Sequence, residues 1–392
     1  MKPLKITLMI LLALICAWLL LGMVMYATGQ WSPLPDTRTL FESTYPVDKV
    51  NALDVDWRDG RVTVERGGET ITVRETARRN QPADQIIQPV IEDGTLKIVQ
   101  RLSRGIRIIV IYDIWDTHLT VTLPDKLYER LFIKGSSGDF VLSDVKADTM
   151  EVHFTSGSGK LNRIETTGLL DVQVTSGSLK ADRLTGSDLK ASCTSGSIRI
   201  SQADFERAEV RNRSGGIRLT DARLGEAALS CTSGSIRSER LTAEKVDAET
   251  SSGSVHLDGT MTSVFAKATS GGVRLNGTMT TVSAKTTSGS VRLIGAMTDV
   301  TAQATSGGIH VDSDVRPDRI NASCHSGSIK VLIPDDPAGF TLKYKVGSGS
   351  MRTDFPLDGF HRDNHTGTHT YGEGQGAYDF SVTSGGIRLT QK

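Results

Sequence analysis

The chain has 392 residues, its 45 Lys and Arg balance 45 Asp and Glu, and only 5% of its residues are aromatic. Balanced charge and few stacking side chains exclude an ordinary nucleic-acid-binding protein. The 39 glycines, with abundant Ser and Thr, predict many short strands and tight turns in place of a large aromatic core.

Residues 6–27 form an uncharged apolar segment behind Lys2 and Lys5. A helix of about 20 apolar residues spans a bilayer, and the lysines favour a cytoplasmic N-terminus. We therefore expect a cytoplasmic tail at 1–5, a single transmembrane anchor at 6–27 and a spacer at 28–48, with the rest of the chain outside the cytoplasm. A cleaved signal peptide is the alternative, but its apolar region is normally about 7–15 residues long.

Residues 49–130 contain strand-like, non-repetitive segments such as "RVTVERG" and "HLTVTLP". They predict the opening turns of a larger β-structure and a cap that covers its exposed edge.

Residues 131–332 contain an internal repeat marked by a Ser-Gly pair. Its spacing is regular, with 19 residues from Gly138 to Gly157 and 18 from Gly253 to Gly271. The marker glycines, called corner glycines below, are Gly138, Gly157, Gly177, Gly196, Gly215, Gly234, Gly253, Gly271, Gly289, Gly307 and Gly327. A looser Ser-Gly pair follows at Gly349 and a clear one at Gly385, within an irregular C-terminal region and cap at 333–392.

Side chains within each repeat alternate with the period of a strand. Around Gly271, small or apolar residues stand at Val264, Ala266 and Ala268 and again at Val273 and Leu275, with polar residues between them. Coils of about 18–20 residues are too short for a β-α-β unit of about 30 residues and for a propeller blade of about 40–45. The pattern therefore predicts an all-β fold, a single-stranded parallel β-solenoid or β-helix, with its coils about 4.8 Å apart.

The cysteines fit this register. Cys193, Cys231 and Cys324 each lie three residues before a corner glycine, in the inward-facing position, while Cys16 lies in the predicted anchor. Because the coil of Asn212 separates Cys193 from Cys231, about two strand spacings lie between them, too far for a disulfide. We expect small buried thiols.

A basic column is the feature best suited to contact a partner. It occupies the outward position three residues after each corner glycine: Lys160, Lys180, Arg199, Arg218, Arg237, His256, Arg274, Arg292, His310, Lys330, Arg352 and Arg388. Like charges on neighbouring strands repel, so acids two residues later, such as Asp182 and Glu239, are expected to compensate part of the charge. The remainder could bind a linear polyanion or anionic lipid headgroups through its Arg and Lys members, or contact a partner coil.

The other motifs in the sequence give weaker evidence for a functional site. The repeated serines argue against a single catalytic nucleophile, and "SGSGK" at Ser156–Lys160 has Phe154 where a P-loop needs glycine. His361, His365 and His369 stand four apart in a polar loop sequence unsuited to a helical metal site. Scattered acids show no pair suited to glycoside hydrolysis. We predict no cofactor, no metal and no catalytic residues.

The order of these features resembles a known family. The segments "VNALDVDWRDGRVTVERG" and "LTVTLPDKLYERLFIKGSSGDF", followed by iterated "TSGS(I/V)R(I/L)", are similar over residues 49–392 to the bacterial family of unknown function labelled putative adhesin. The resemblance implies a β-solenoid-like ectodomain at a bacterial cell surface, in some members associated with envelope stress. It implies no catalytic residues.

These features together favour a non-enzymatic, membrane-anchored surface scaffold that binds envelope polymer or another surface protein, and no nucleic acid. Two alternatives stay open. One is a carbohydrate-active β-helix enzyme that acts on envelope glycans, and the other is a structural protein that polymerises end to end.

Overall fold

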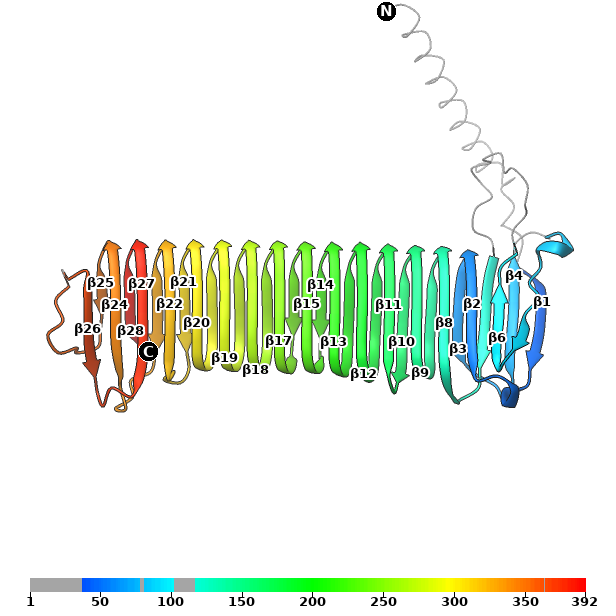
Figure 1. The fold of residues 1–392 in the computed structure, drawn as a ribbon, viewed down its shortest axis with the longest axis horizontal. Coiled ribbons are helices and arrows are strands. Elements are labelled where there is room, and N and C mark those ends of the chain that lie inside the picture. The colour runs from blue at the N-terminus through cyan, green and yellow to red at the C-terminus, as the bar shows by residue number, and fades with distance from the viewer. Residues whose placement is uncertain (1–36, 78–80, 102–116, 363) are drawn as a thin grey trace, which may run out of the picture.

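The computed structural model describes residues 37–77, 81–101, 117–362 and 364–392. They form a straight rod in which the strands lie across the long axis (Figure 1). The predicted parallel β-solenoid is confirmed, with about 11 regular turns and no α-helix in the described ranges. The predicted anchor at 6–27 falls outside these ranges.

Among the described residues, no helix has the length and apolar character needed to cross a membrane.

Each regular coil starts after one corner glycine and ends at the next corner serine. Its ladder is interrupted on the way, at a second bend such as Arg183 and again near Ser187. In β12 and β13, for example, the pairing runs in register from Leu179 opposite Ile198 to Ser195 opposite Ser214. The strands of this region are β9 (Phe140–Ser156), β10 (Gly159–Thr166), β11 (Leu169–Ser176), β12 (Leu179–Ser195), β13 (Ile198–Ser214), β14 (Ile217–Thr220), β15 (Arg223–Ser233), β16 (Ile236–Glu239), β17 (Leu241–Ser252), β18 (Val255–Ser270), β19 (Val273–Ser288), β20 (Val291–Ser306), β21 (Ile309–Ser313), β22 (Arg319–Ser326) and β23 (Ile329–Ile333).

The core runs the length of the rod. Val264, Ala266 and Leu275, predicted to face inward, are buried. Aromatic residues gather at the two ends of the core. Phe140 stacks on Phe154 near the N-terminal end with ring centroids 4.6 Å apart, and Phe340 stacks on Tyr378 near the C-terminal end at the same distance. Large rings therefore close the ends, whereas the middle is filled mostly by aliphatic side chains, with Phe205 a buried exception.

The corner glycines stack directly on one another. Gly234 has a φ of +144°, and a Cβ there would lie 2.1 Å from the carbonyl oxygen of Gly215 in the preceding coil. Only glycine combines this backbone conformation with so close an approach. The Ser-Gly motif is thus a structural corner.

The second bend explains why coil length changes from 19 or 20 residues to 18. In the longer coils from Gly138 to Gly253, the sixth residue after the corner glycine is a non-glycine in the left-handed region, such as Asp221 (φ 53°) or Arg240 (φ 55°). In the 18-residue coils the sixth residue is a glycine, such as Gly259 (φ 150°), and it pairs with the seventh residue of the longer coil, Leu241. Relative to the shorter coil, Arg240 is therefore one extra residue, and it bulges outward.

The N-terminal end is interleaved. Its elements are β1 (Arg38–Tyr45), η1 (Val47–Lys49), β2 (Ala52–Asp59), β3 (Arg61–Arg66), β4 (Ile71–Ala77), η2 (Ala83–Gln85), β5 (Val90–Glu92), β6 (Thr95–Val99), β7 (Thr117–Leu123) and β8 (Leu127–Ser137). The coil of β2 and β3 pairs on one side with β8 and β9 and on the other with β6 and β7, which come later in the chain. Antiparallel strand β4 then covers β7, and β1 covers β4.

The C-terminal end is interleaved in the same way. Its strands are β24 (Phe340–Ser348), β25 (Met351–Thr353), β26 (Thr366–Tyr371), β27 (Gly376–Ser384) and β28 (Ile387–Gln391). The sequence indicates a final coil at the corner glycine Gly385, but this coil is second from the end: β27 lies between β22 and β24 (Figure 1). Antiparallel strand β26 covers β24 at the tip.

Candidate functional site

The basic column forms as an unbroken ladder. Each member lies opposite the next: Lys160–Lys180, Lys180–Arg199, Arg199–Arg218, Arg218–Arg237, Arg237–His256, His256–Arg274, Arg274–Arg292, Arg292–His310, His310–Lys330, Lys330–Arg388 and Arg388–Arg352. All the Lys and Arg members are exposed, and the two histidines are half-buried. The spatial order differs from the chain order only at the tip, where the inserted coil places Arg388 before Arg352.

The expected counter-charges are mostly engaged elsewhere. Asp182 pairs with Arg183, Asp258 accepts a hydrogen bond from Asn276, and Asp312 pairs with Lys392. Within the described ranges, Arg218 is the only Lys or Arg of the basic column in an ion pair, with 3.7 Å between its Nη1 and Oε1 of Glu239. Compensation along the column is thus weaker than the sequence predicts.

Charges near the second bend, at positions six to eleven after the corner glycine, behave in the opposite way, because they pair from coil to coil. The ion pairs Asp144–Arg163, Asp188–Arg207, Asp204–Arg223, Asp221–Arg240 and Glu226–Lys245 each join neighbouring coils. The Arg207 guanidinium lowers the pKa of Asp188, and that of Arg240 lowers the pKa of Asp221. One edge of the rod is therefore charge-balanced, whereas the basic column is not.

A hollow of about 380 Å³ lies along the basic column between Ser197 and Arg237. Arg199, Arg218 and Arg237 line one side, and Ser197 and Ser235 line the other. The Ser235 hydroxyl oxygen accepts the Ser254 N–H at 3.3 Å, which leaves the hydroxyl proton available to a ligand. Three guanidiniums beside hydroxyl donors suit a phosphate or carboxylate group. Sequence reasoning missed the hydroxyl side, although a serine after most of the corner glycines was visible in the repeat.

The two histidines of the basic column have lowered pKa values, because they are half-buried and lie between cations. Burial lowers the pKa of His256, and its neighbours Arg237 and Arg274 lower it further. Burial and Arg292 likewise lower the pKa of His310, with a smaller opposing effect from Asp312. Both rings are therefore neutral at neutral pH.

Cys193, Cys231 and Cys324 are buried and unpaired, as predicted, and they also have a structural role. The thiols of Cys193, Cys231 and Cys324 donate hydrogen bonds to the corner-glycine carbonyls of the preceding coils, at 3.1, 2.9 and 3.0 Å. Asn212 and Thr250 make the same bond in their coils. Burial raises the pKa of each thiol, which makes the three poor nucleophiles.

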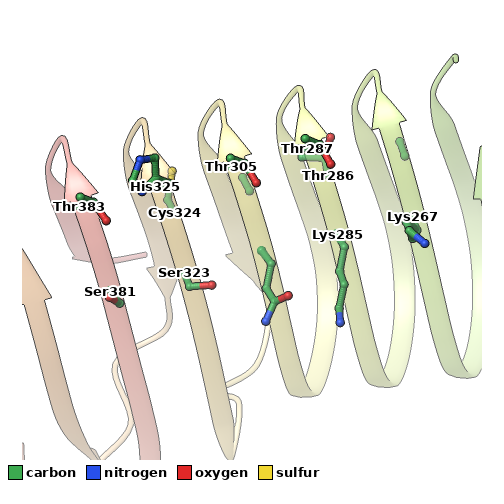
Figure 2. Close-up of a pocket in the computed structure, with 13 residues that line it drawn as sticks. Lys267, Lys285, Thr286, Thr287, Thr305, Ser323, Cys324, His325, Ser381 and Thr383 are labelled. Atoms are coloured by element: carbon green, nitrogen blue, oxygen red, sulfur yellow. The ribbon is translucent and has the colours of Figure 1, made fainter. Parts of the chain in front are cut away.

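A second surface feature is a trough of about 480 Å³ across β18, β19, β20, β22 and β27. Figure 2 shows Lys267 and Lys285 toward one end and His325 and Thr383 toward the other, with hydroxyl side chains between them. Its cations are engaged: Lys267 pairs with Glu249 at 3.7 Å, and the Lys285 ammonium lies 5.9 Å from the ring centroid of Phe265. The trough is polar but lacks the unpaired charge of the basic column.

The remaining candidates do not assemble into a site. His369 lies in β26, where it stacks on Tyr344 at 5.9 Å, whereas His361 and His365 precede the strand. The described residues contain no cluster of three or more His, Cys, Asp or Glu that could hold a metal ion. Of the scattered acids, Asp204 pairs with Arg223 at 3.5 Å and Asp221 pairs with Arg240.

A family model matches nearly the whole of this repeat architecture. The model of Toastrack DUF4097, a family of unknown function, matches residues 50–257, 168–294 and 239–390. The chain belongs to the Toastrack DUF4097 family. The resemblance noted in the sequence is confirmed to this extent, and no curated protein matches this Toastrack chain.

Solved structures of similar proteins are remote. A putative adhesin from Parabacteroides merdae is 18% identical, with 63% of this Toastrack chain and 96% of that chain covered and a TM-score of 0.41. A putative lipid binding protein from Parabacteroides distasonis is 14% identical, with coverage of 74% and 95% and a TM-score of 0.35. A putative adhesin from Bacteroides fragilis is 14% identical, with coverage of 92% and 100% and a TM-score of 0.29. Values this low carry no functional argument for this chain.

Proposed function

We propose that this protein is a non-enzymatic, membrane-anchored scaffold of the cell envelope, and that its basic column binds a linear anionic polymer. The observation that supports the proposal is the contrast between two edges of one rod. Charges near the second bend are paired from coil to coil, whereas the Lys and Arg of the basic column face solvent with a single ion pair among the described residues.

The shape of the charged surface favours a chain over a membrane. The column is a single file of cations, and a phosphate-bearing or uronic polymer presents a single file of anions at repeated intervals. One flank of the column carries hydroxyls such as Ser235, while the other carries acids such as Asp182 and Asp258. A planar anionic bilayer would bring its headgroups onto those acids, and like charges at close range repel.

Arginine suits this role because its planar guanidinium binds carboxylate and phosphate with two parallel hydrogen bonds. Exposed contacts of this kind are individually weak, so affinity arises from many rungs acting on one chain. Binding should therefore weaken steeply with salt.

The test compares two variants that lose the same charge. The first replaces Arg199, Arg218, Arg274 and Arg292 of the basic column with Gln. The matched control replaces four paired arginines near the second bend with Gln: Arg163, Arg207, Arg223 and Arg240. Both are measured in the full chain, purified in an uncharged detergent, against polygalacturonate and poly(glycerol phosphate) over a range of salt concentrations.

We expect the basic-column variant to lose at least tenfold in affinity, by roughly 1 kcal/mol or less per charge, and to lose part of the salt dependence. The control variant should bind like the wild type. Equal loss of affinity in both variants would show that net charge alone explains the binding. Unchanged binding in the first variant would show that the basic column does not bind the polymer. Binding confined to phosphatidylglycerol vesicles, with none to either polymer, would favour a lipid surface instead.

A further inference from the structure

Two histidines divide the basic column. His256 lies between Arg237 and Arg274, and His310 lies between Arg292 and Lys330. With neutral rings at these rungs, the cations form three separate runs. They are Lys160 to Arg237, Arg274 with Arg292, and Lys330 with Arg388 and Arg352.

The charges around His256 come mainly from the column itself. Arg237 on β16 and Arg274 on β19 flank the ring, Asp258 follows two residues later on the same strand, and Glu239 lies beyond Arg237. Asp258 accepts a hydrogen bond from Asn276, and Glu239 pairs with Arg218. No carboxylate within 4 Å therefore forms an ion pair with His256 in the described part of the chain, and the arginines oppose its protonation.

His310 has similar surroundings. Arg292 on β20 and Lys330 on β23 flank it, and Asp312 follows on its own strand. Lys392 donates to Asp312 at 3.0 Å, so this carboxylate is already partly neutralised. Both rings are half-buried in the outer face, within reach of a ligand that lies along the column.

We propose, as an inference that rests on the proposed function, that His256 and His310 make the basic column a pH-dependent binding surface. Near neutral pH the polymer contacts three separate cationic runs. When the medium becomes mildly acidic, both rings take up a proton and the runs join into one continuous ladder.

The coupling works in both directions. A bound polyanion offsets the field of Arg237, Arg274, Arg292 and Lys330, which raises the pKa of both histidines. Protons are therefore taken up on binding, and added protons tighten binding by the same linkage. Two extra charges next to an anionic chain should strengthen binding roughly tenfold between about pH 7.5 and about pH 5.5.

Poly(glycerol phosphate) is the probe for the test, because its phosphodiesters stay ionised throughout this range. The full chain in uncharged detergent is compared with two double variants. His256→Gln with His310→Gln keeps both rungs neutral, and His256→Arg with His310→Arg keeps both charged. The wild type should gain affinity on acidification, the Gln variant should stay near the neutral-pH affinity, and the Arg variant should already show the acidic affinity at about pH 7.5.

Calorimetry in two buffers of different ionisation enthalpy gives an independent readout, because proton uptake on binding should appear in the wild type and disappear in both variants. If the wild type and the Gln variant gain equally on acidification, or if no protons are taken up, the histidine proposal is wrong. Binding that is present but insensitive to pH overturns this inference alone, whereas absence of binding at every pH overturns the proposed function itself.

Discussion

Gly234 is a corner glycine, and Gly216 follows the corner glycine of the preceding coil. Only the Gly234 position requires glycine. A Cβ on Gly234 would lie 2.1 Å from the Gly215 carbonyl oxygen, at a φ of +144°. A Cβ on Gly216 would meet only the Ser235 carbonyl oxygen at 3.2 Å. Serine occupies the Gly216 position in the flanking coils, at Ser197 and Ser235. The first glycine is therefore obligatory and the second is a tolerated variant.

Gly234→Ala should lower the free energy of unfolding by about 2–4 kcal/mol, because the strained backbone and the backbone clash add together. Gly216→Ala should change it by less than about 1 kcal/mol. Urea denaturation of the two variants checks this. Comparable losses in both would mean that the corner relaxes to admit a side chain, contrary to the stacking of glycines described here.

The inserted strand β27 packs its aromatic face inside the rod, so a phenylalanine of β27 should contribute more to stability than one on the outer face. Phe380 on β27 is fully buried and lies 6.2 Å from Tyr378, whereas Phe265 on β18 faces outward beneath Lys285. Phe380→Ala should cost about 3–5 kcal/mol, felt mainly in the C-terminal strands, since a solenoid is stabilised largely by contacts between neighbouring coils.

Hydrogen exchange of the Phe380→Ala variant should be faster over residues 340–391 and unchanged over 140–306. Phe265→Ala, the matched control, should leave both regions protected, at a cost of less than about 1 kcal/mol. Faster exchange along the whole rod in the Phe380 variant would show that the coils unfold as one unit instead.

Much of this architecture was predictable from the sequence. The spacing of the Ser-Gly pairs fixed the register of the regular coils, and with it the rungs from Lys160 to Lys330. The order of the last coils was not predictable, because the Ser-Gly segments at Gly349 and Gly385 both fit beside Gly327. The structure places Gly385 there. The pairing of Asp221 with Arg240 was not predictable either, because it depends on the bulged second bend, where the two side chains point outward together.

Both ends of the rod are covered by antiparallel strands, β4 with β1 at one end and β26 at the other. A parallel coil of a second molecule cannot continue the ladder from these edges without displacing them. The structure therefore disfavours end-to-end polymerisation, and we expect the wild-type chain to sediment as a monomer in detergent at all practical concentrations.

Replacing His369 and Tyr371 with proline should remove two of the backbone donors by which β26 pairs with β24 and expose the edge of β24. Association that grows with concentration should follow, as measured by sedimentation. The matched control changes the same two residues to alanine, which keeps every N–H, and it should remain a monomer. A proline variant that folds and stays monomeric would show that β26 is not what protects this end.

The interleaved C-terminus also bears on how the rod responds to mechanical force. Tension on the chain beyond Gln391 acts on β28, which is hydrogen-bonded to β23 on one side and to β25 on the other. An edge strand would detach by breaking one ladder of hydrogen bonds, one bond after another. Here two ladders resist together, and the pull must draw the strand out from between its neighbours. A surface rod gripped at this end would hold against loads that peel an ordinary terminal strand away.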